Sequence, residues 1–200
     1  MFHYISGAVA ELLPGAVVID CSGVGFQINT SAYSLSQLKA GETAKLYTYV
    51  YIREDIFEIY GFSTQSEKHC FEMLLGVSGV GPKAAVAILS VNTPEGLVMA
   101  IISENDKAIS AASGVGKKIA QRVILELKDK MAKETAEVSF KDVSFTPQPV
   151  GTPGKLGDAS AALAVLGYST AEINAALRNI DIEALSLEEI IRAALKQMVK

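Results

Sequence analysis

Gly79-Val80-Gly81-Pro82-Lys83 recurs 35 residues later as Gly114-Val115-Gly116-Lys117-Lys118. Each copy follows a short apolar run and precedes another run with helical spacing. When the two copies are aligned, Ala85 falls opposite Ala120 and Ile88 falls opposite Val123. An internal repeat of this kind predicts two equivalent structural units that perform the same task.

The chemistry of the repeated turn indicates a phosphate site. Glycines at alternate positions permit positive φ and leave no Cβ in the way, so successive N–H groups can point toward one anion. The helix that begins after each turn adds unpaired N–H groups and the positive end of its dipole. Such a site holds nucleic-acid backbone without reading bases, whereas the alternative is a tight helix-helix turn with no ligand. The candidate phosphate-binding residues are Gly79, Val80, Gly81, Lys83, Gly114, Val115, Gly116, Lys117, Lys118 and Arg122.

Two other glycine-rich sites are excluded by the residues around the first turn. A Walker A loop needs a lysine directly after its last glycine and then a hydroxyl residue, but Pro82 and Lys83 stand there and Ala84 follows. A dinucleotide-binding loop needs a third glycine where Ala84 stands, and no parallel-sheet strand precedes the turn.

Composition favours a cytoplasmic protein without cofactors. Half of the 200 residues are hydrophobic, yet no run of 18 apolar residues could span a membrane, and the N-terminus lacks the pattern of a signal peptide. Cys21 and Cys70 have no C-x-x-C spacing, and His3 and His69 form no ligand cluster. We therefore expect reduced packing cysteines, no metal and no membrane partner.

The net charge of −4 is unfavourable for a nucleic-acid binder, so its distribution matters. Residues 63–135, which hold both turns, carry nine basic and eight acidic side chains. DNA binding is therefore inferred from the positions of the lysines and not from overall charge. One copy should bind weakly, and several copies acting together would be needed.

The first 63 residues have the pattern of an OB-type β-barrel. Turn residues separate short runs rich in β-formers, and a helical turn at 34–38 fits between the third and fourth runs. The tyrosines of the fourth run alternate with aliphatic residues, and they either stack bases on an exposed face or serve as core or subunit contacts. The five predicted strands are Tyr4–Leu13, Ala16–Cys21, Gly25–Thr30, Ala44–Ile52 and Phe57–Phe62.

Glu54 and Asp55 are adjacent carboxylates at the predicted tip between the fourth and fifth strands. They are either a solvated turn or a negative post that repels phosphates. A nuclease or lyase would need a third ligand or a perturbed lysine nearby, and the sequence supplies neither. We therefore expect a binding protein and no enzyme.

From residue 64 onward the spacing is helical. Thr64 with Glu67 has the form of a capping box, Thr93-Pro94 starts another helix, and the longest helix is expected from Lys117 to about 133. The pattern predicts two helix-hairpin-helix units over residues 64–135.

The remainder divides into a tether and a small helical module. Prolines alternate with glycines in residues 136–157, which predicts a flexible linker. Residues 158–200 predict a UBA-like three-helix domain, with capping boxes at Ser169/Glu172 and Ser186/Glu189. A slightly acidic tethered module suits docking to a partner protein, and this adaptor role is compatible with DNA binding. The predicted fold class is multidomain α+β.

Motifs along the whole chain resemble, in order, the RuvA family, the Holliday junction-binding subunits of bacterial branch migration complexes. Helix-hairpin-helix units alone are common in DNA repair proteins, whereas the combination is specific. The matching segments are Arg53-Glu54-Asp55, Tyr60-Gly61-Phe62, Gly79 to Lys83, Ala87-Ile88-Leu89-Ser90, Gly114 to Lys118, and Glu126-Leu127-Lys128-Asp129-Lys130.

The resemblance implies a non-enzymatic homotetramer that lays a four-way junction on a basic concave face, singly or as two tetramers, in recombination and DNA repair. Glu54 and Asp55 would form an acidic pin at the crossover. Residues 158–200 would dock on the hexameric ATPase RuvB, and the complex would also engage the nuclease RuvC. Two departures stand out: Met1-Phe2-His3 replaces the usual Met-Ile-Gly, and Ser113 stands where proline commonly precedes the second turn.

Overall fold

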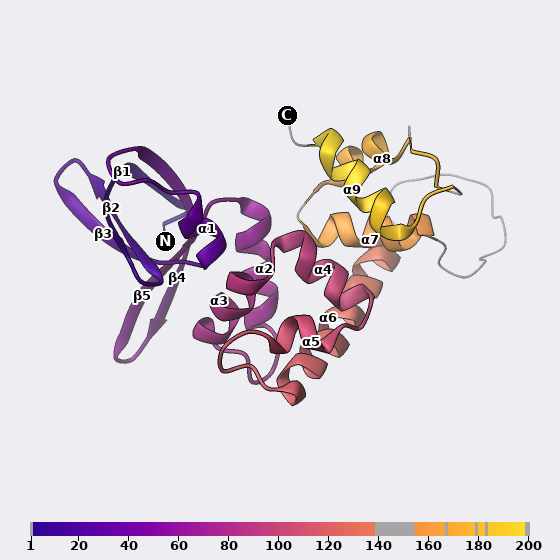
Figure 1. Ribbon diagram of the computed structural model, residues 1–200, viewed down its shortest axis with the longest axis horizontal. Coiled ribbons are helices and arrows are strands. Elements are labelled where there is room, and N and C mark those ends of the chain that lie inside the picture. The colour runs from indigo at the N-terminus through magenta and orange to yellow at the C-terminus, as the bar shows by residue number, and fades with distance from the viewer. Residues whose placement is uncertain (1, 139–154, 167, 179, 183, 199–200) are drawn as a thin grey trace.

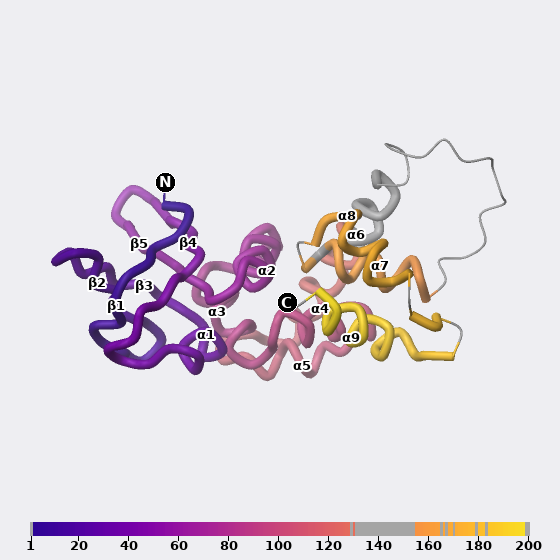
Figure 2. The backbone as a smooth tube through the Cα atoms, turned by 90° about the horizontal axis from the view of Figure 1, so that it is seen from above, coloured from indigo at the N-terminus to yellow at the C-terminus, as the bar shows by residue number. Residues whose placement is uncertain are grey.

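The computed structural model describes residues 2–138 and 155–198, except 167, 179 and 183. A small β-barrel lies at one end, the helices of the repeat lie in the middle, and three C-terminal helices lie at the other end (Figure 1). The view from above shows the same order along the molecule (Figure 2).

The N-terminal barrel is closed by five strands in the order β1-β2-β3-β5-β4. All neighbouring strands are antiparallel except β3 and β5, which are parallel. Apolar side chains from alternate positions fill it, including Val17, Ile19 and Leu46. The predicted OB-type barrel is confirmed, and each strand end lies within one residue of its expected position. The elements are β1 (Tyr4–Leu13), β2 (Ala16–Cys21), β3 (Val24–Asn29), α1 (Ala32–Ser36), β4 (Thr43–Arg53) and β5 (Ile56–Phe62).

The middle of the chain folds into helices around a separate apolar core. Thr93 caps α4 by accepting a hydrogen bond from the Gly96 N–H, and Asn105 caps α5 in the same way from Ala108. These helices bury Leu97 and Ile101 together with much of the repeat. The elements are α2 (Gln65–Leu75), α3 (Pro82–Val91), α4 (Pro94–Ile102), α5 (Asp106–Ser110) and α6 (Lys117–Val138).

The expected capping box at the start of α2 is only half formed. Thr64 Oγ1 accepts a hydrogen bond from the Glu67 N–H at 3.1 Å, as predicted. The Glu67 side chain does not return to Thr64 and is instead fully buried against the barrel. It accepts hydrogen bonds from the hydroxyls of Ser31 and Ser34, with Ser63 at 3.5 Å. Glu67 therefore joins the barrel to the helices instead of capping its own helix.

Aromatic packing strengthens the same junction between barrel and helices. Phe71 of α2 stacks on Tyr60 at 5.2 Å between ring centroids and contacts Phe62 at 4.9 Å. Tyr49 meets the same ring edge-on at 5.5 Å, and Tyr51 meets Tyr60. Of the two interpretations of the tyrosine row, core packing holds for Tyr49 and Tyr51. The hairpin of β4 and β5 is thus held against α2.

The C-terminal helices are α7 (Lys155–Val165), α8 (Thr170–Leu177) and α9 (Leu187–Met198). Both predicted capping boxes are present, with each serine and glutamate exchanging hydrogen bonds. Helix occupies both ends of the expected 136–157 linker, because α6 continues to Val138 and α7 begins at Lys155. The rest of that predicted linker, 139–154, lies outside the described residues.

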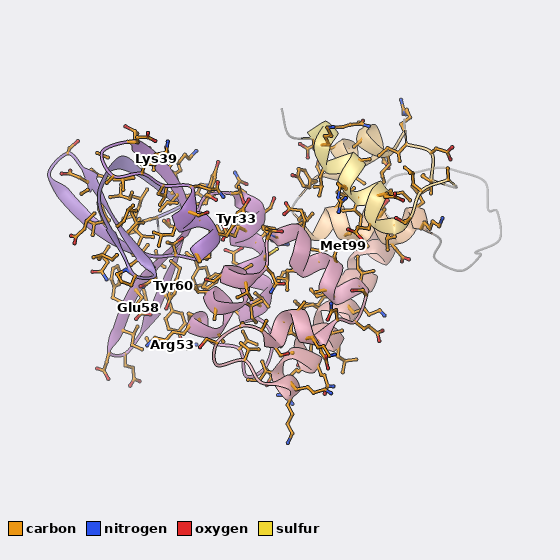
Figure 3. All side chains as sticks on the ribbon, viewed as in Figure 1. Tyr33, Lys39, Arg53, Glu58, Tyr60 and Met99 are labelled. Carbon is orange, nitrogen blue, oxygen red and sulfur yellow. The ribbon has the colours of Figure 1, made fainter. Side chains whose placement is uncertain are left out.

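The three C-terminal helices pack on α4 and α6, and their buried side chains continue the core of the middle helices. A pocket of about 520 Å³ remains between α4 and α9, lined by Met99, Tyr168 and Leu195 among others (Figure 3). Within the described residues no single helix is long and apolar enough to cross a membrane. One bent pair, α3 with α4, passes the same test jointly, at an angle of 94°.

Candidate nucleic-acid interface

The two glycine turns are equivalent hydrogen bond for hydrogen bond. The Val80 N–H donates to the Val77 carbonyl at 3.0 Å, and 35 residues later the Val115 N–H donates to the Ala112 carbonyl at 3.1 Å. The first helical bonds, from Ala85 to Gly81 and from Ala120 to Gly116, match in the same way. The repeat in sequence is therefore a repeat in three dimensions.

Each pair of glycines divides the work of the turn. Gly79 and Gly114 have positive φ values of 87° and 77°, which disfavour other residues. Gly81 has a φ of −94° and caps α3, so only the first glycine of a pair needs the left-handed region. A Cβ added at Gly81 or Gly116 would meet no protein atom within 4 Å. The second glycine therefore leaves open space at the helix start, where a ligand backbone can approach.

The residue between the glycines anchors each turn. Val80 and Val115 are 6% and 5% exposed, and their N–H groups already donate within the turn. Among the described residues, the N–H groups of Gly81 and Gly116 donate no such bond. We infer that the two valines support the site from the core, while the second glycines and the first helical N–H groups face the anion.

Three lysines surround the open ends of these turns. Lys83 lies in the first turn of α3, and Lys117 and Lys118 begin α6. Lys117 Nζ is 3.9 Å from Asp106 Oδ2, with 74% of the lysine side chain accessible. No ion pair within 4.0 Å is found for Lys83 or Lys118 in the described part of the chain. These two cations are available to meet phosphates.

Arg122 links the second unit to the first. One guanidinium nitrogen lies 3.4 Å from both the carbonyl and the hydroxyl oxygen of Ser78. Glu126 supports this contact, because it accepts from the Ser78 N–H and lies 3.9 Å from the Arg122 Nε. Ser78 was not among the residues predicted from sequence, although a serine precedes the first glycine in both copies, at 78 and 113. Arg122 thus holds the first turn close to α6.

The acidic tip is a two-residue turn between β4 and β5. Glu54 and Asp55 are exposed, and neither has a cationic partner within 4.0 Å among the described residues. Arg53 turns back along the strand, where its Nε donates to the Tyr51 hydroxyl at 3.1 Å, and this bond raises the pKa of Arg53. The tip therefore presents two carboxylates.

The tip and the glycine turns lie at the same edge of the molecule, the lower one in Figure 1. Arg53, Glu58 and Tyr60 lie along the arm that carries the tip (Figure 3). The Tyr60 hydroxyl donates to Glu58 at 2.6 Å, and burial followed by this bond raises the pKa of Tyr60. In the described residues, no group of three or more His, Cys, Asp or Glu could hold a metal ion.

A closed five-strand barrel, paired glycine turns at helix starts and lysines beside them define a DNA-binding protein of the tandem helix-hairpin-helix class. Comparison with known proteins narrows that class. Family models match residues 1–61 (RuvA N terminal domain), 71–129 (SAM-like helix-hairpin-helix tandem) and 154–199 (RuvA C-terminal domain). The chain belongs to the RuvA family.

Curated relatives of similar length support this assignment. The Holliday junction branch migration complex subunit RuvA of Acetivibrio thermocellus is 42% identical over 201 residues, covering 100% of both chains. The protein of the same name from Ruminiclostridium cellulolyticum is 40% identical over 199 residues, covering 99% of this chain and 100% of the relative.

Proposed function

We propose that this chain binds four-way DNA junctions as a non-catalytic subunit of a branch migration complex. The observation that carries the proposal is the pair of equivalent glycine turns with lysines at their open ends, placed at the same edge as an acidic tip. Two phosphate grips per chain supply affinity for backbone, and the unpaired carboxylates between grips of neighbouring subunits favour a branched substrate over a continuous duplex. The names of the relatives agree with this activity.

We further propose that the working form is a homotetramer, with one subunit for each arm. The weak positive charge around the turns supports this, because several weak sites joined in one assembly gain affinity through high effective concentration. The test is the mass of the protein with and without junction DNA. Four chains of 21.2 kDa per junction, or eight for a two-sided complex, are expected. A single chain bound to one junction would overturn the tetramer.

The proposed units are a barrel (1–63), a DNA-binding helical domain (64–135), a linker (136–157) and a docking domain (158–200) that recruits the hexameric ATPase RuvB. The complex would also accommodate the resolvase RuvC and act in the cytoplasm. Support for separate tasks comes from the family matches, which end and begin again between 129 and 154.

Truncation at residue 150 is expected to separate these tasks. The chain lacking residues 151–200 keeps both glycine turns, so junction affinity should change less than about threefold, whereas stimulation of RuvB ATPase should disappear. Gel-shift titration and an ATPase assay measure the two effects, and an unchanged unfolding midpoint of the shortened chain serves as control. Retained stimulation would place the motor contact elsewhere.

Reversing the tip charge, with Glu54→Lys and Asp55→Lys together, is expected to leave junction binding equal or tighter while impairing strand separation. Lysines at the tip would attract the phosphates that the carboxylates repel. Permanganate oxidation of crossover thymines reports unpaired bases, and it should fall in the variant. Because both side chains are exposed, folding should not change; a loss of folding would instead favour a purely structural turn.

A further inference from the structure

Three large apolar side chains lie in water around the acidic tip. Ile52 and Phe57 are each 64% exposed and Ile56 is 42% exposed. Ile52 stands directly opposite Phe57 across the β4–β5 ladder, and the next pair is Arg53 with Ile56, directly before the turn. The apolar pair therefore sits one rung behind Glu54 and Asp55.

The position of the pair explains why no core covers it. Alternate residues of a strand share a face, so Ile52 and Phe57 share the face of Ile59 and Leu46, which fill the barrel. The hairpin continues past the end of the barrel, and there this face has no core left to join. On the opposite face Arg53 is bound to Tyr51, whose ring packs on Tyr60. Among the described residues, then, the Ile52/Phe57 side of the hairpin is the one most open to an external surface.

The charge of the tip selects what can cover this pair. A phosphate group, or the same tip of a second copy, would bring negative charge next to Glu54 and Asp55. An unstacked nucleobase has a neutral, flat face that suits apolar contact, and its amino groups can donate to carboxylates. Apolar side chains such as Phe and Ile are known to enter base steps as wedges.

We propose that Ile52 and Phe57 form an apolar wedge that contacts the bases at the junction crossover, while Glu54 and Asp55 keep the phosphates apart. This inference rests on the proposed function, since it assigns a base contact to the same tip. The carboxylates alone would open a gap between strands. The wedge gives the exposed bases a surface to rest on, so the opened crossover is held and not merely repelled.

The test uses the full chain with Ile52→Thr and Phe57→Thr combined, because threonine keeps strand preference and removes the large apolar surface. The probe is a four-way junction with 2-aminopurine at the crossover, whose fluorescence rises on unstacking. Wild-type protein at saturation should raise the signal several-fold. The double variant should lose more than half of that rise, with junction affinity within about threefold and unchanged mass. Val24→Thr, at an exposed apolar residue of the β2–β3 hairpin, is the matched control and should behave as wild type.

A second variant reports the contact directly. The sequence contains no tryptophan, so Phe57→Trp introduces a single fluorophore at the wedge. Its emission should be quenched by junction DNA and not by duplex DNA at equal occupancy.

An unchanged 2-aminopurine signal in the double variant overturns the wedge, and so does indole emission that junction DNA fails to quench in the F57W protein. A smaller assembly mass in the double variant also overturns it, because the pair would then be a subunit contact. If wild-type protein shows no preference for junction over duplex, the proposed function itself fails, which is a separate result.

Discussion

Replacing Lys117 and Lys118 by alanine is expected to weaken junction binding on the order of 50-fold at about 0.1 M salt. The slope of log affinity against log salt changes by about 0.9 for each phosphate contact, so two lost contacts reduce it by about 1.8 and cost that affinity at this concentration. Both side chains are exposed at the start of α6. The loss should be the same for junctions of any sequence, because phosphate contacts carry no base information.

A matched variant removes the same charge from the same helix. Lys128 is paired with Glu104 at 2.5 Å, and Lys130 lies further along α6, away from the turn. Lys128→Ala with Lys130→Ala should change affinity less than about threefold and leave the salt slope nearly intact. Equal losses in both double variants would mean that general charge, and not the glycine turn, governs binding. An unchanged slope in the Lys117/Lys118 variant would remove these lysines from the site.

Replacing Glu67 by alanine is expected to lower the free energy of unfolding by about 3 kcal/mol. The change leaves the buried hydroxyls of Ser31 and Ser34 without their acceptor, and each unsatisfied buried group costs about 1–3 kcal/mol. Urea unfolding followed by circular dichroism measures the change. Glu72→Ala removes an exposed i,i+4 partner of Lys68 on the same helix and should cost less than about 0.5 kcal/mol. Equal stability of the Glu67 variant and wild type would show that the cluster does not hold the barrel to the helices.

The same carboxyl gives stability a pH dependence of known sign. Burial raises the pKa of Glu67, and the hydrogen bonds from Ser31, Ser34 and Ser63 offset only part of that rise. The folded chain therefore binds this proton more tightly than the unfolded chain, whose carboxyl has the ordinary value of 4.5. This contribution is fully present below pH 4.5 and is lost as pH rises through the folded pKa. Glu67→Gln should lack that decline, which compares directly with wild type across the same pH range.

The barrel and the repeated helices were predictable because their signals are local. Strand alternation, the turns at Pro14-Gly15 and Gly23, and caps such as Thr93 depend on neighbours within a few residues. The glycine turns were found because the same local solution appears twice. Positive φ at Gly79 and Gly114 confirms that part, whereas the glycine that follows each valine serves open space instead.

Contacts between distant segments could not be predicted in the same way. Glu67 has the sequence position of a capping residue, but the hydroxyls of Ser31 and Ser34, 36 and 33 residues away, compete for its carboxylate. Arg122 reaches Ser78 across 44 residues. The exposure of Ile52 and Phe57 follows from where the barrel ends, which the alternation of the strand does not reveal.

The most direct test of the central claim is a competition measurement between a four-way junction and a linear duplex of the same arm sequence, at one salt concentration of about 0.15 M, near physiological ionic strength. Grips arranged around an acidic tip predict a preference for the junction on the order of 100-fold or more, within the range by which specific DNA sites exceed non-specific ones. The preference should be retained when the arm sequences are changed and reduced by Glu54→Lys with Asp55→Lys. Equal affinity for junction and duplex would contradict the account, because the glycine turns would then hold DNA backbone without recognising a branch.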